Sequence, residues 1–420
     1  VCDFDLAKAI CNAAVNQNKI AKVHLKIETG MGRIGTAINE AVELAKKYGM
    51  QKISGMVRVF QAIEKMNDVL NLSIGEPDFI TEPDITEAGA EAAKKGFTHY
   101  PPLQGFLDVR EAACAYWERH HNYKNSPDNV YISVGSLHVP YLAFAALLNP
   151  GDEILLFEPY FTPYASQIRS AGGVAVGIKT HEENNFAPTV EELEKYLTPK
   201  TRGIILNSPC NPSGRVLNLK QLEEIAEFVI KHDLFVLSDE IYESMIFNGS
   251  HNCFANIPGM HERTLLCGGV AKSHCMTGWR IGYVFAPQNV INTMCVLSSF
   301  QTYGVNTLAQ KAAAYAMNTQ DEKVKERAKI FGERMKAVRE KLNNMKGVKC
   351  HEAEGAFYLF PKALEDDDYA FCERAKKYDL LLVPGADFGC KGYFRAAYCI
   401  KTETIERSLP LFKKLAEEYK

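Results

Sequence analysis

The sequence lacks long apolar runs, blocks of like charge and clustered cysteines. Its longest strongly apolar stretch, residues 139–148, is about half the length of a bilayer-spanning helix, so we expect no membrane partner. The 48 Lys and Arg residues face 51 Asp and Glu without a polybasic block, which argues against a nucleic-acid partner. The 12 cysteines form no Cys-x-x-Cys pair and no zinc-type Cys/His cluster. We therefore expect a cytoplasmic protein with reduced thiols and no metal site.

Between residues 133 and 237, short apolar runs alternate with amphipathic stretches. Strands are predicted at residues 152–157, 173–178, 201–206 and 234–237. Helices with charged outer faces are predicted at residues 190–197 and 219–231. This alternation is typical of an α/β fold in which a mixed, mainly parallel sheet lies between helices.

The C-terminal hundred residues have a different pattern. Long charged amphipathic helices are predicted at residues 321–344 and 403–420, and short strands at residues 356–360 and 380–383. The mixture predicts a smaller α+β unit. No low-complexity linker separates it from the rest of the 420-residue chain.

The N-terminal stretch carries a GxGxxG pattern at residues 30–35, between a strand-like run and a helical one. The second strand with an acidic end, which a dinucleotide site needs about 20 residues later, is missing. Residues 22–35 instead resemble a short stretch of alanine racemases. The segment includes neither that family's cofactor-binding lysine nor its catalytic tyrosine. We therefore expect residues 1–48 to be an appended β/α fragment without racemase chemistry.

The strongest chemical signal lies in residues 271–280, AKSHCMTGWR. Lys272 can bond to an aldehyde cofactor, while Arg280 can pair with a phosphate on the same molecule. Two further polar motifs, NSPCNPSG (207–214) and SDEIY (238–242), follow predicted strands, where open α/β sheets place ligands. A buried Asp239 would need a cation to satisfy its charge.

These motifs occur in an order that resembles the fold-type I, class I aminotransferases, which use pyridoxal 5′-phosphate (PLP). The resemblance runs from about residue 52 to residue 420. Within the family it is closest to bacterial aromatic amino acid aminotransferases, through GEPDF (75–79), FTHYPPLQG (97–105), AKSHCMTGWRIG (271–282) and GAFYLFP (355–361). One departure is Gly269, which stands where some relatives have a phosphate-binding serine.

The resemblance implies a role for each matching position around the cofactor ring. Lys272 would hold PLP covalently and move the proton at the substrate α-carbon. Asp239 would lie under the pyridine nitrogen, and Phe161 would stack on the ring. Tyr242 and Asn211 would hydrogen-bond the 3-hydroxyl group.

The resemblance also implies how phosphate and substrate are held. Arg280 and the backbone of Gly135, Ser136 and Leu137 would bind the phosphate, where a strand turns into a helix start. Tyr100 would reach the phosphate of a neighbouring subunit, which implies a homodimer with shared active sites. The substrate-binding residues would be Arg395, which grips the α-carboxylate, together with Gly75 and Asn211.

The implied fold has three parts. Residues 93–316 would form the large PLP-binding domain, residues 52–92 and 317–420 a small domain built from both ends of this region, and residues 1–48 the racemase-like fragment. The implied reaction is a ping-pong transfer of the amino group of an L-amino acid, aromatic by subgroup, to a 2-oxo acid. Two alternatives stay open at this stage: β-elimination from an S-substituted cysteine, and a PLP-binding regulatory protein without turnover.

Overall fold

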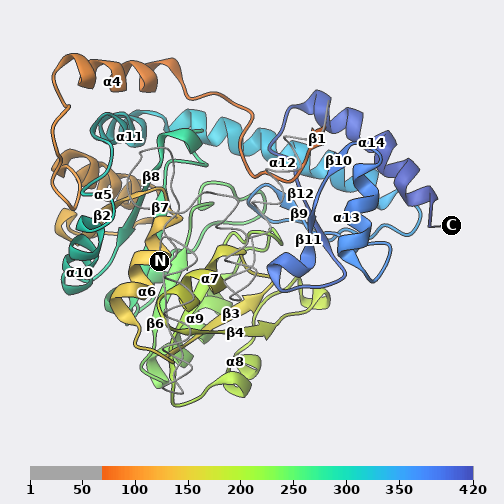
Figure 1. Ribbon diagram of the computed structural model, residues 1–420, viewed down its shortest axis with the longest axis horizontal. Helices are drawn as coiled ribbons and strands as arrows, with labels where there is room; N and C mark the ends of the chain where they lie inside the picture. Colours follow the sequence, from red (N-terminus) through yellow and green to blue (C-terminus); the bar gives the residue numbers. More distant parts are fainter. Residues whose placement is uncertain (1–68, 420) are drawn as a thin grey trace, which may run out of the picture. The chain divides into compact units, whose positions relative to one another are not determined.

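The computed structural model describes residues 69–419, which belong to one compact unit of the chain, Val59–Lys420. The racemase-like fragment and the GxGxxG pattern lie outside the described residues. In Figure 1 the described part begins at strand β1 (Leu70–Asn71) and runs through to helix α14 (Thr402–Glu417).

A seven-stranded sheet forms the centre of the molecule. Its order is β2-β8-β7-β6-β5-β3-β4. All neighbours are parallel except β8, which is antiparallel to both β2 and β7. The strands are β2 (Val130–Val134), β3 (Glu153–Glu158), β4 (Val174–Lys179), β5 (Thr201–Asn207), β6 (Phe235–Asp239), β7 (Thr264–Gly269) and β8 (Ile281–Phe285). The expected mainly parallel mixed sheet is confirmed, and the four predicted strands lie within two residues of their observed bounds.

Helices cover both faces of this sheet because successive strand residues point to opposite sides. On β3, Ile154 and Leu156 pack in a core with helices α6, α7 and α10, whereas Leu155 and Phe157 pack in a core with α8 and α9. At the β2–β8 end, α5 and α11 cover the second face. The bounds are α5 (Leu107–His121), α6 (His138–Leu147), α7 (Pro163–Ser170), α8 (Val190–Tyr196), α9 (Leu219–Lys231), α10 (Gln288–Ser299) and α11 (Thr307–Thr319).

Most of the longest apolar run of the sequence forms helix α6. Its residues Val139, Leu142 and Phe144 are fully buried against the sheet. Such a short apolar helix belongs to the protein core. Among the described residues, no helix combines the length and the apolar character that crossing a membrane requires.

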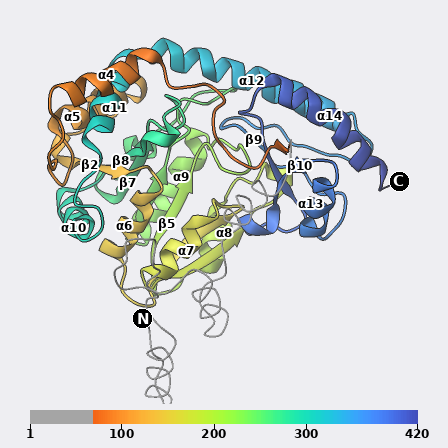
Figure 2. The same ribbon diagram turned by 45° about the horizontal axis from the view of Figure 1, so that its top comes forward.

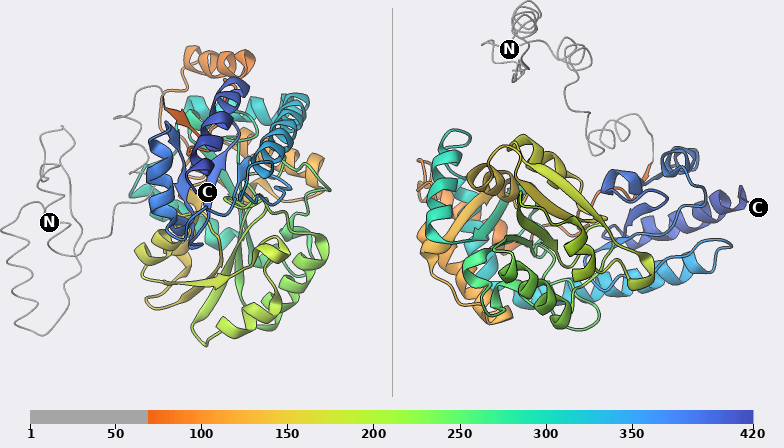
Figure 3. Two further views of the ribbon diagram at one scale, coloured as in Figure 1. Left: turned by 90° about the vertical axis from the view of Figure 1, so that its right-hand side faces the viewer. Right: turned by 90° about the horizontal axis from the view of Figure 1, so that it is seen from below.

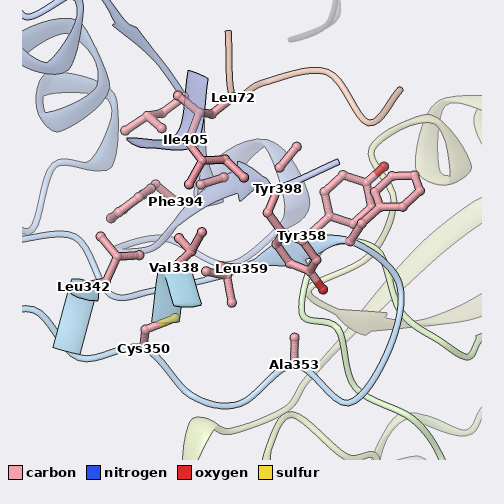
Figure 4. Packing of buried hydrophobic residues seen from close by; sticks show 14 of the residues in the cluster. Leu72, Val338, Leu342, Cys350, Ala353, Tyr358, Leu359, Phe394, Tyr398 and Ile405 are labelled. Atoms are coloured by element: carbon pink, nitrogen blue, oxygen red, sulfur yellow. The ribbon is translucent and has the colours of Figure 1, made fainter. Parts of the chain in front are cut away.

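The C-terminal residues form smaller sheets packed on three helices. A three-stranded sheet has the order β11-β12-β9, and β1 pairs in parallel with β10. The strands are β9 (Tyr358–Leu359), β10 (Leu380–Leu381), β11 (Val383–Pro384) and β12 (Phe394–Ala397), and the helices are α12 (Asp321–Asn343), α13 (Asp368–Lys376) and α14. Figure 4 shows their shared core, in which Leu72 from the start of the described chain lies near Ile405 of α14. The proposed domain boundaries stay a prediction.

The C-terminal strands differ from the predicted ones. The strand expected at 380–383 is two short strands in different sheets, β10 with β1 and β11 with β12. The strand expected at 356–360 shrinks to Tyr358–Leu359, because Ala356 has a positive φ of 58°, which breaks the extended run.

Helix α12 joins the two groups of elements. Figure 2 and Figure 3 show it extending from the helices around the large sheet to α14. Helix α4 (Pro83–Lys94) packs on α11, and the chain between β1 and α4 runs from the small sheets to the helices around the large sheet (Figure 1). Residues of this chain segment contact the candidate active site.

Candidate active site

The predicted site residues gather at the carboxyl ends of β5, β6 and β7. Asn207 ends β5 and pairs with Asp239 at the end of β6, which in turn pairs with Cys267 of β7. Lys272 is the third residue after β7. Neighbouring parallel strands end at the same edge of a sheet. The strand register alone therefore places Asp239 beside the loop that follows β7 and carries Lys272, which we call the lysine loop.

Asp239 is a buried carboxylate with neutral hydrogen-bond donors. Its side chain accepts a hydrogen bond from Tyr164 Oη at 2.6 Å and one from the Ile241 amide at 3.2 Å. The residue is 6% exposed, and burial raises its pKa from 3.8 to about 6 even though the Tyr164 bond lowers it. A cation placed here would therefore be bound strongly.

Lys272 is an amine prepared to react as a neutral base. Burial, with smaller contributions from Arg395 and Arg280, lowers its pKa from 10.5 to about 8. Its Nζ donates a hydrogen bond to the Gly75 carbonyl at 2.6 Å and lies 5.8 Å from the centre of the Phe357 ring. An uncharged amine is the form that attacks an aldehyde and the form that accepts a proton.

A cup of backbone amides and one arginine forms where β2 meets α6. Gly135 has a φ of 69°, and a Cβ added to it would lie 2.5 Å from Arg280 Nη2. Arg280 is exposed, and its carbonyl accepts the Gly135 amide at 3.0 Å. Leu137 is the residue before α6, and the first two amides of the helix, those of His138 and Val139, donate to the Gly135 and Ser136 carbonyls at 3.1 Å. Gly135, Ser136, Leu137 and Arg280 are thus together, as predicted, in an arrangement suited to a phosphate.

The structure explains the glycine at position 269. A Cβ on Gly269 would lie 2.5 Å from Ser136 Oγ, which donates to the Gly268 carbonyl at 2.8 Å. The Ser136 hydroxyl therefore fills the space that a serine at 269 would need.

Arg395 on β12 faces the same edge from the small sheets. It is 3% exposed, and its Nη1 donates to Asn211 Oδ1 at 2.8 Å while its Nη2 donates to the Ser73 carbonyl. Its Nε has no hydrogen-bond partner among residues 69–419. The guanidinium lies 4.5 Å from the ring centre of Tyr358 and 4.9 Å from that of Phe388. These contacts fix the orientation of the guanidinium plane.

Tyr242 and Tyr358 form a buried pair. Their hydroxyl oxygens are 2.8 Å apart, and their rings meet edge to face at 5.8 Å. Burial raises both pKa values, that of Tyr358 to about 12, so both hydroxyls stay protonated at neutral pH. Tyr358 thus connects Tyr242 to Arg395, and Figure 4 shows it at the edge of the small-sheet core.

Phe161 and Tyr100 complete the predicted set. Phe161 contacts Tyr164 edge to face at 5.5 Å, which places it beside the partner of Asp239. Tyr100 stands apart: it is 82% exposed, and its ring meets that of Tyr303 at 5.1 Å.

Two contributing residues were not predicted from the sequence. Tyr164 lies in the EPYFTPY motif (158–164), one helical turn after Phe161, and Tyr358 lies in the GAFYLFP motif. The sequence points to Phe161 and to the GAFYLFP motif, so each tyrosine could have been found by asking which buried hydroxyl serves Asp239 or Tyr242. Their partners are 75 and 116 residues away in the chain, a separation that spacing does not reveal.

The donor set fits a flat, anionic cofactor with an aldehyde and a protonated ring nitrogen. Lys272 supplies the amine, the cup at Gly135 and Arg280 supplies the anion site, and Asp239 supplies a buried carboxylate that forms no ion pair within residues 69–419. PLP has these three features. In the described part of the chain, no group of three His, Cys, Asp or Glu side chains could hold a metal ion.

Known proteins resemble this chain along most of its length. The family model described as Aminotransferase class I and II matches residues 67–410, and that of the alanine racemase N-terminal domain matches residues 1–67. Aromatic-amino-acid aminotransferase 2 of Thermococcus litoralis is 36% identical over 387 residues, covering 90% of this chain and 99% of that protein. An aspartate aminotransferase of Pyrococcus abyssi is 38% identical over 375 residues, covering 86% and 95%. The crystal structure of an aromatic aminotransferase from Pyrococcus horikoshii has a TM-score of 0.81 at 38% identity, covering 86% and 99%.

Proposed function

The chain belongs to the class I and II aminotransferases, and from this premise we propose that its preferred amino donor is an aromatic L-amino acid. It is a PLP-dependent transferase that moves an amino group from an amino acid to a 2-oxo acid. Its match to the racemase family covers residues 1–67, outside the described residues.

The observation that carries the donor proposal is the aromatic lining around Arg395. The guanidinium of Arg395 lies 4.5 Å from the ring centre of Tyr358 and 4.9 Å from that of Phe388. Nζ of Lys272 lies 5.8 Å from the ring centre of Phe357. Such rings favour a flat apolar side chain. Two other arginines near the site, Arg327 and Arg334, are each paired with a carboxylate, so neither is free for a second substrate carboxylate.

The proposed roles follow from the geometry of the site. When bound, PLP supplies a conjugated ring that takes up the electron pair left at the substrate Cα. Asp239 keeps a positive charge on the ring nitrogen, and Tyr164 holds the carboxylate in place. Nζ of Lys272 accepts the proton that leaves the substrate Cα. Arg395 grips the α-carboxylate and so sets which Cα bond stands across the ring.

We also propose a homodimer with shared active sites. Large apolar side chains are exposed beside the cup: Phe300 is 80% exposed, next to Tyr303 and Tyr100. Gln301 in the same segment accepts from or donates to His138 of α6 at 2.8 Å, so the patch adjoins the start of α6. An apolar patch of this kind is suited to a protein interface. In the proposed dimer, Tyr100 reaches the partner's phosphate cup.

A cytoplasmic location is proposed from the thiols. The ten described cysteines are free, and seven of them are buried. Reduced thiols in this number are typical of a reducing compartment.

An aspartate donor is the second candidate, because the Pyrococcus abyssi relative is named an aspartate aminotransferase. The test is to measure kcat/KM for L-phenylalanine, L-tyrosine, L-aspartate and L-alanine with one common 2-oxo acid acceptor. The proposal predicts at least about a tenfold preference for the aromatic donors, the range that one apolar pocket gives. An equal or higher kcat/KM for L-aspartate would replace the aromatic proposal by the aspartate one.

A further inference from the structure

The segment that joins β1 to α4 lies across the candidate site. We call residues 73–82 the strap. It has no regular secondary structure, and Figure 1 shows it as the orange trace running from β1 to α4. Two of its backbone carbonyls contact the site: Ser73 accepts from Arg395 and Gly75 accepts from Lys272. The strap thus touches both the proposed carboxylate clamp and the proposed proton carrier.

The strap is packed closely against Tyr358. A Cβ added to Gly75 would lie 1.7 Å from Tyr358 Oη, so no larger residue fits without moving the ring. The Ser73 and Gly75 carbonyls accept hydrogen bonds from the two groups to which the proposed function assigns the substrate α-carboxylate and the substrate proton. The position of residues 73–77 therefore affects how these two groups are held.

An ion pair anchors the strap on helix α12. Asp78 accepts two hydrogen bonds from Arg334, at 2.7 Å to Nη1 and 2.9 Å to Nη2. Both side chains are largely buried, at 13% and 11% exposed. The Arg334 guanidinium also lies 5.5 Å from the Phe79 ring centre and 5.7 Å from that of Phe331. A bidentate pair enclosed by rings fixes both partners in one geometry.

A second ion pair anchors the end of the strap. Glu82 pairs with Arg327, which lies seven residues before Arg334 and thus two turns away on the same face of α12. Arg327 is 3% exposed, and its Nη1 also lies 3.4 Å from the Ser273 carbonyl, directly after Lys272. Arg327 thus connects the strap, α12 and the lysine loop.

Thr81 adds a third connection between strap and lysine loop. Its hydroxyl donates to the Cys275 carbonyl at 2.7 Å and accepts from Trp279 Nε1 at 3.1 Å. Residues 78–82 are therefore fixed at three points. Residues 73–77 contact the site through the Ser73 and Gly75 carbonyls and through Glu76, whose carboxylate accepts a hydrogen bond from the Thr277 hydroxyl.

We propose that Arg334 and Arg327 are positioning residues for transamination: by fixing residues 78–82 on α12, they hold residues 73–77 in place over Lys272 and Arg395. The proposal rests on the proposed function for the roles of Lys272 and Arg395. Neither arginine touches the reacting atoms. Loosening the anchors lowers the fraction of enzyme whose strap is correctly placed, so substrate affinity falls while the cofactor site stays intact.

The test uses the PLP-loaded enzyme and the variants Asp78→Asn and Arg334→Gln. We expect KM for L-phenylalanine and for the 2-oxo acid to rise about tenfold, kcat to change less than about threefold, and the absorbance of the lysine-bound cofactor to be unchanged. Arg334→Lys keeps the positive charge but loses the planar guanidinium that donates two hydrogen bonds to Asp78, so it should give an intermediate KM. Lys325→Gln on the exposed side of α12 is the matched control, because its partner Glu322 is 88% exposed.

Hydrogen exchange supplies a readout that needs no substrate. We expect faster exchange of the amides in residues 73–77 in Asp78→Asn than in Lys325→Gln. If either anchor variant fails to fold, Thr81→Val removes only the hydroxyl link and should produce the same changes to a smaller extent. Unchanged KM and exchange in a folded variant would overturn the proposal, as would loss of the cofactor band in step with the rise in KM. If the unmodified enzyme transaminates no donor, the proposed function fails, while the exchange result still decides whether the anchors hold the strap.

Discussion

At the scale of single residues, burial moves two pKa values toward each other across the site. The pKa of Asp239 is raised to about 6, and that of Lys272 is lowered to about 8, burial being the largest cause in both cases. Above about pH 6 the carboxylate is charged and can hold a cation. Above about pH 8 the lysine is a free amine. The two shifts prepare the site for a cofactor with a basic ring nitrogen and an aldehyde.

The lowered lysine pKa predicts how fast the cofactor-free enzyme binds PLP covalently. Only the neutral amine reacts, and its fraction rises about tenfold per pH unit below the pKa and then levels off. The rate of appearance of the lysine-bound absorbance, corrected for the titration of free PLP, should therefore rise up to about pH 8 and be flat above it. A rate that keeps rising to pH 10 would contradict the lowered pKa.

Replacing Tyr164 by Phe tests the partner of Asp239. The hydrogen bond from Tyr164 lowers the pKa of Asp239, so its loss leaves the carboxyl group harder to ionise. We expect the dissociation constant of PLP to rise about tenfold at neutral pH, the effect of about 1.5 kcal/mol for a hydrogen bond to a charged group. Tyr196→Phe, on helix α8, is the control. An unchanged dissociation constant for Tyr164→Phe would show that the bond does not support the cofactor.

Residue roles could be predicted from the sequence where a motif places its groups next to each other in the chain. Lys272 and Arg280 lie in one motif, and the structure puts Arg280 at the cup and Lys272 near enough for Arg280 to contribute to its lowered pKa. Tyr358 could not be assigned in this way, because its partners Tyr242 and Arg395 lie on other elements and meet it only after the sheets have packed. The same holds for the strap, whose contacts depend on α12.

At the scale of elements, the antiparallel strand β8 helps to shape the cup. It lies between β2 and β7 and brings Gly282 against the loop that forms the cup. A Cβ on Gly282 would lie 2.3 Å from the Ser136 amide nitrogen, a backbone atom that cannot easily give way. Parallel strands could be predicted from their apolar runs, whereas the reversed direction of β8 leaves no such signal in composition.

The variant Gly282→Ala therefore tests whether β8 shapes the cup. The methyl group would push the loop of residues 135–137 away, at a cost of about 2 kcal/mol for overpacking. We expect PLP affinity to fall by about thirtyfold, the equivalent of that cost. Gly278→Ala is the matched control, because nothing lies within 4 Å of its added Cβ. Equal PLP affinity for the two variants would contradict the account.

At the scale of the whole molecule, the large sheet carries the residues proposed to bind the cofactor and the small sheets carry Arg395. The two meet through direct contacts, such as that of Arg395 with Asn211 at 2.8 Å, and through α12. The α/β class and the long helices could be predicted, since α12 was expected at 321–344 and is observed at Asp321–Asn343. The division of the C-terminal strands between two sheets could not be predicted from the sequence, because two-residue strands carry too little periodicity.

The proposed homodimer predicts that an exposed charge at its interface separates the subunits. Phe300→Asp should give a monomer in sedimentation analysis and lower activity at least about tenfold, because Tyr100 would no longer reach the partner's cup. Ile230→Asp on α9, at another exposed apolar position, should leave the assembly and activity unchanged. A fully active Phe300→Asp monomer would refute shared active sites.

A single-turnover experiment shows whether this site carries out transamination. PLP-loaded enzyme is mixed with excess L-phenylalanine without any 2-oxo acid, and absorbance and released products are followed together. The account predicts that the lysine-bound cofactor band disappears in step with release of one equivalent of the 2-oxo acid, and that Lys272→Ala shows neither change. A band that survives every amino acid tested, or release of pyruvate from L-cystathionine by repeated turnover, would contradict it.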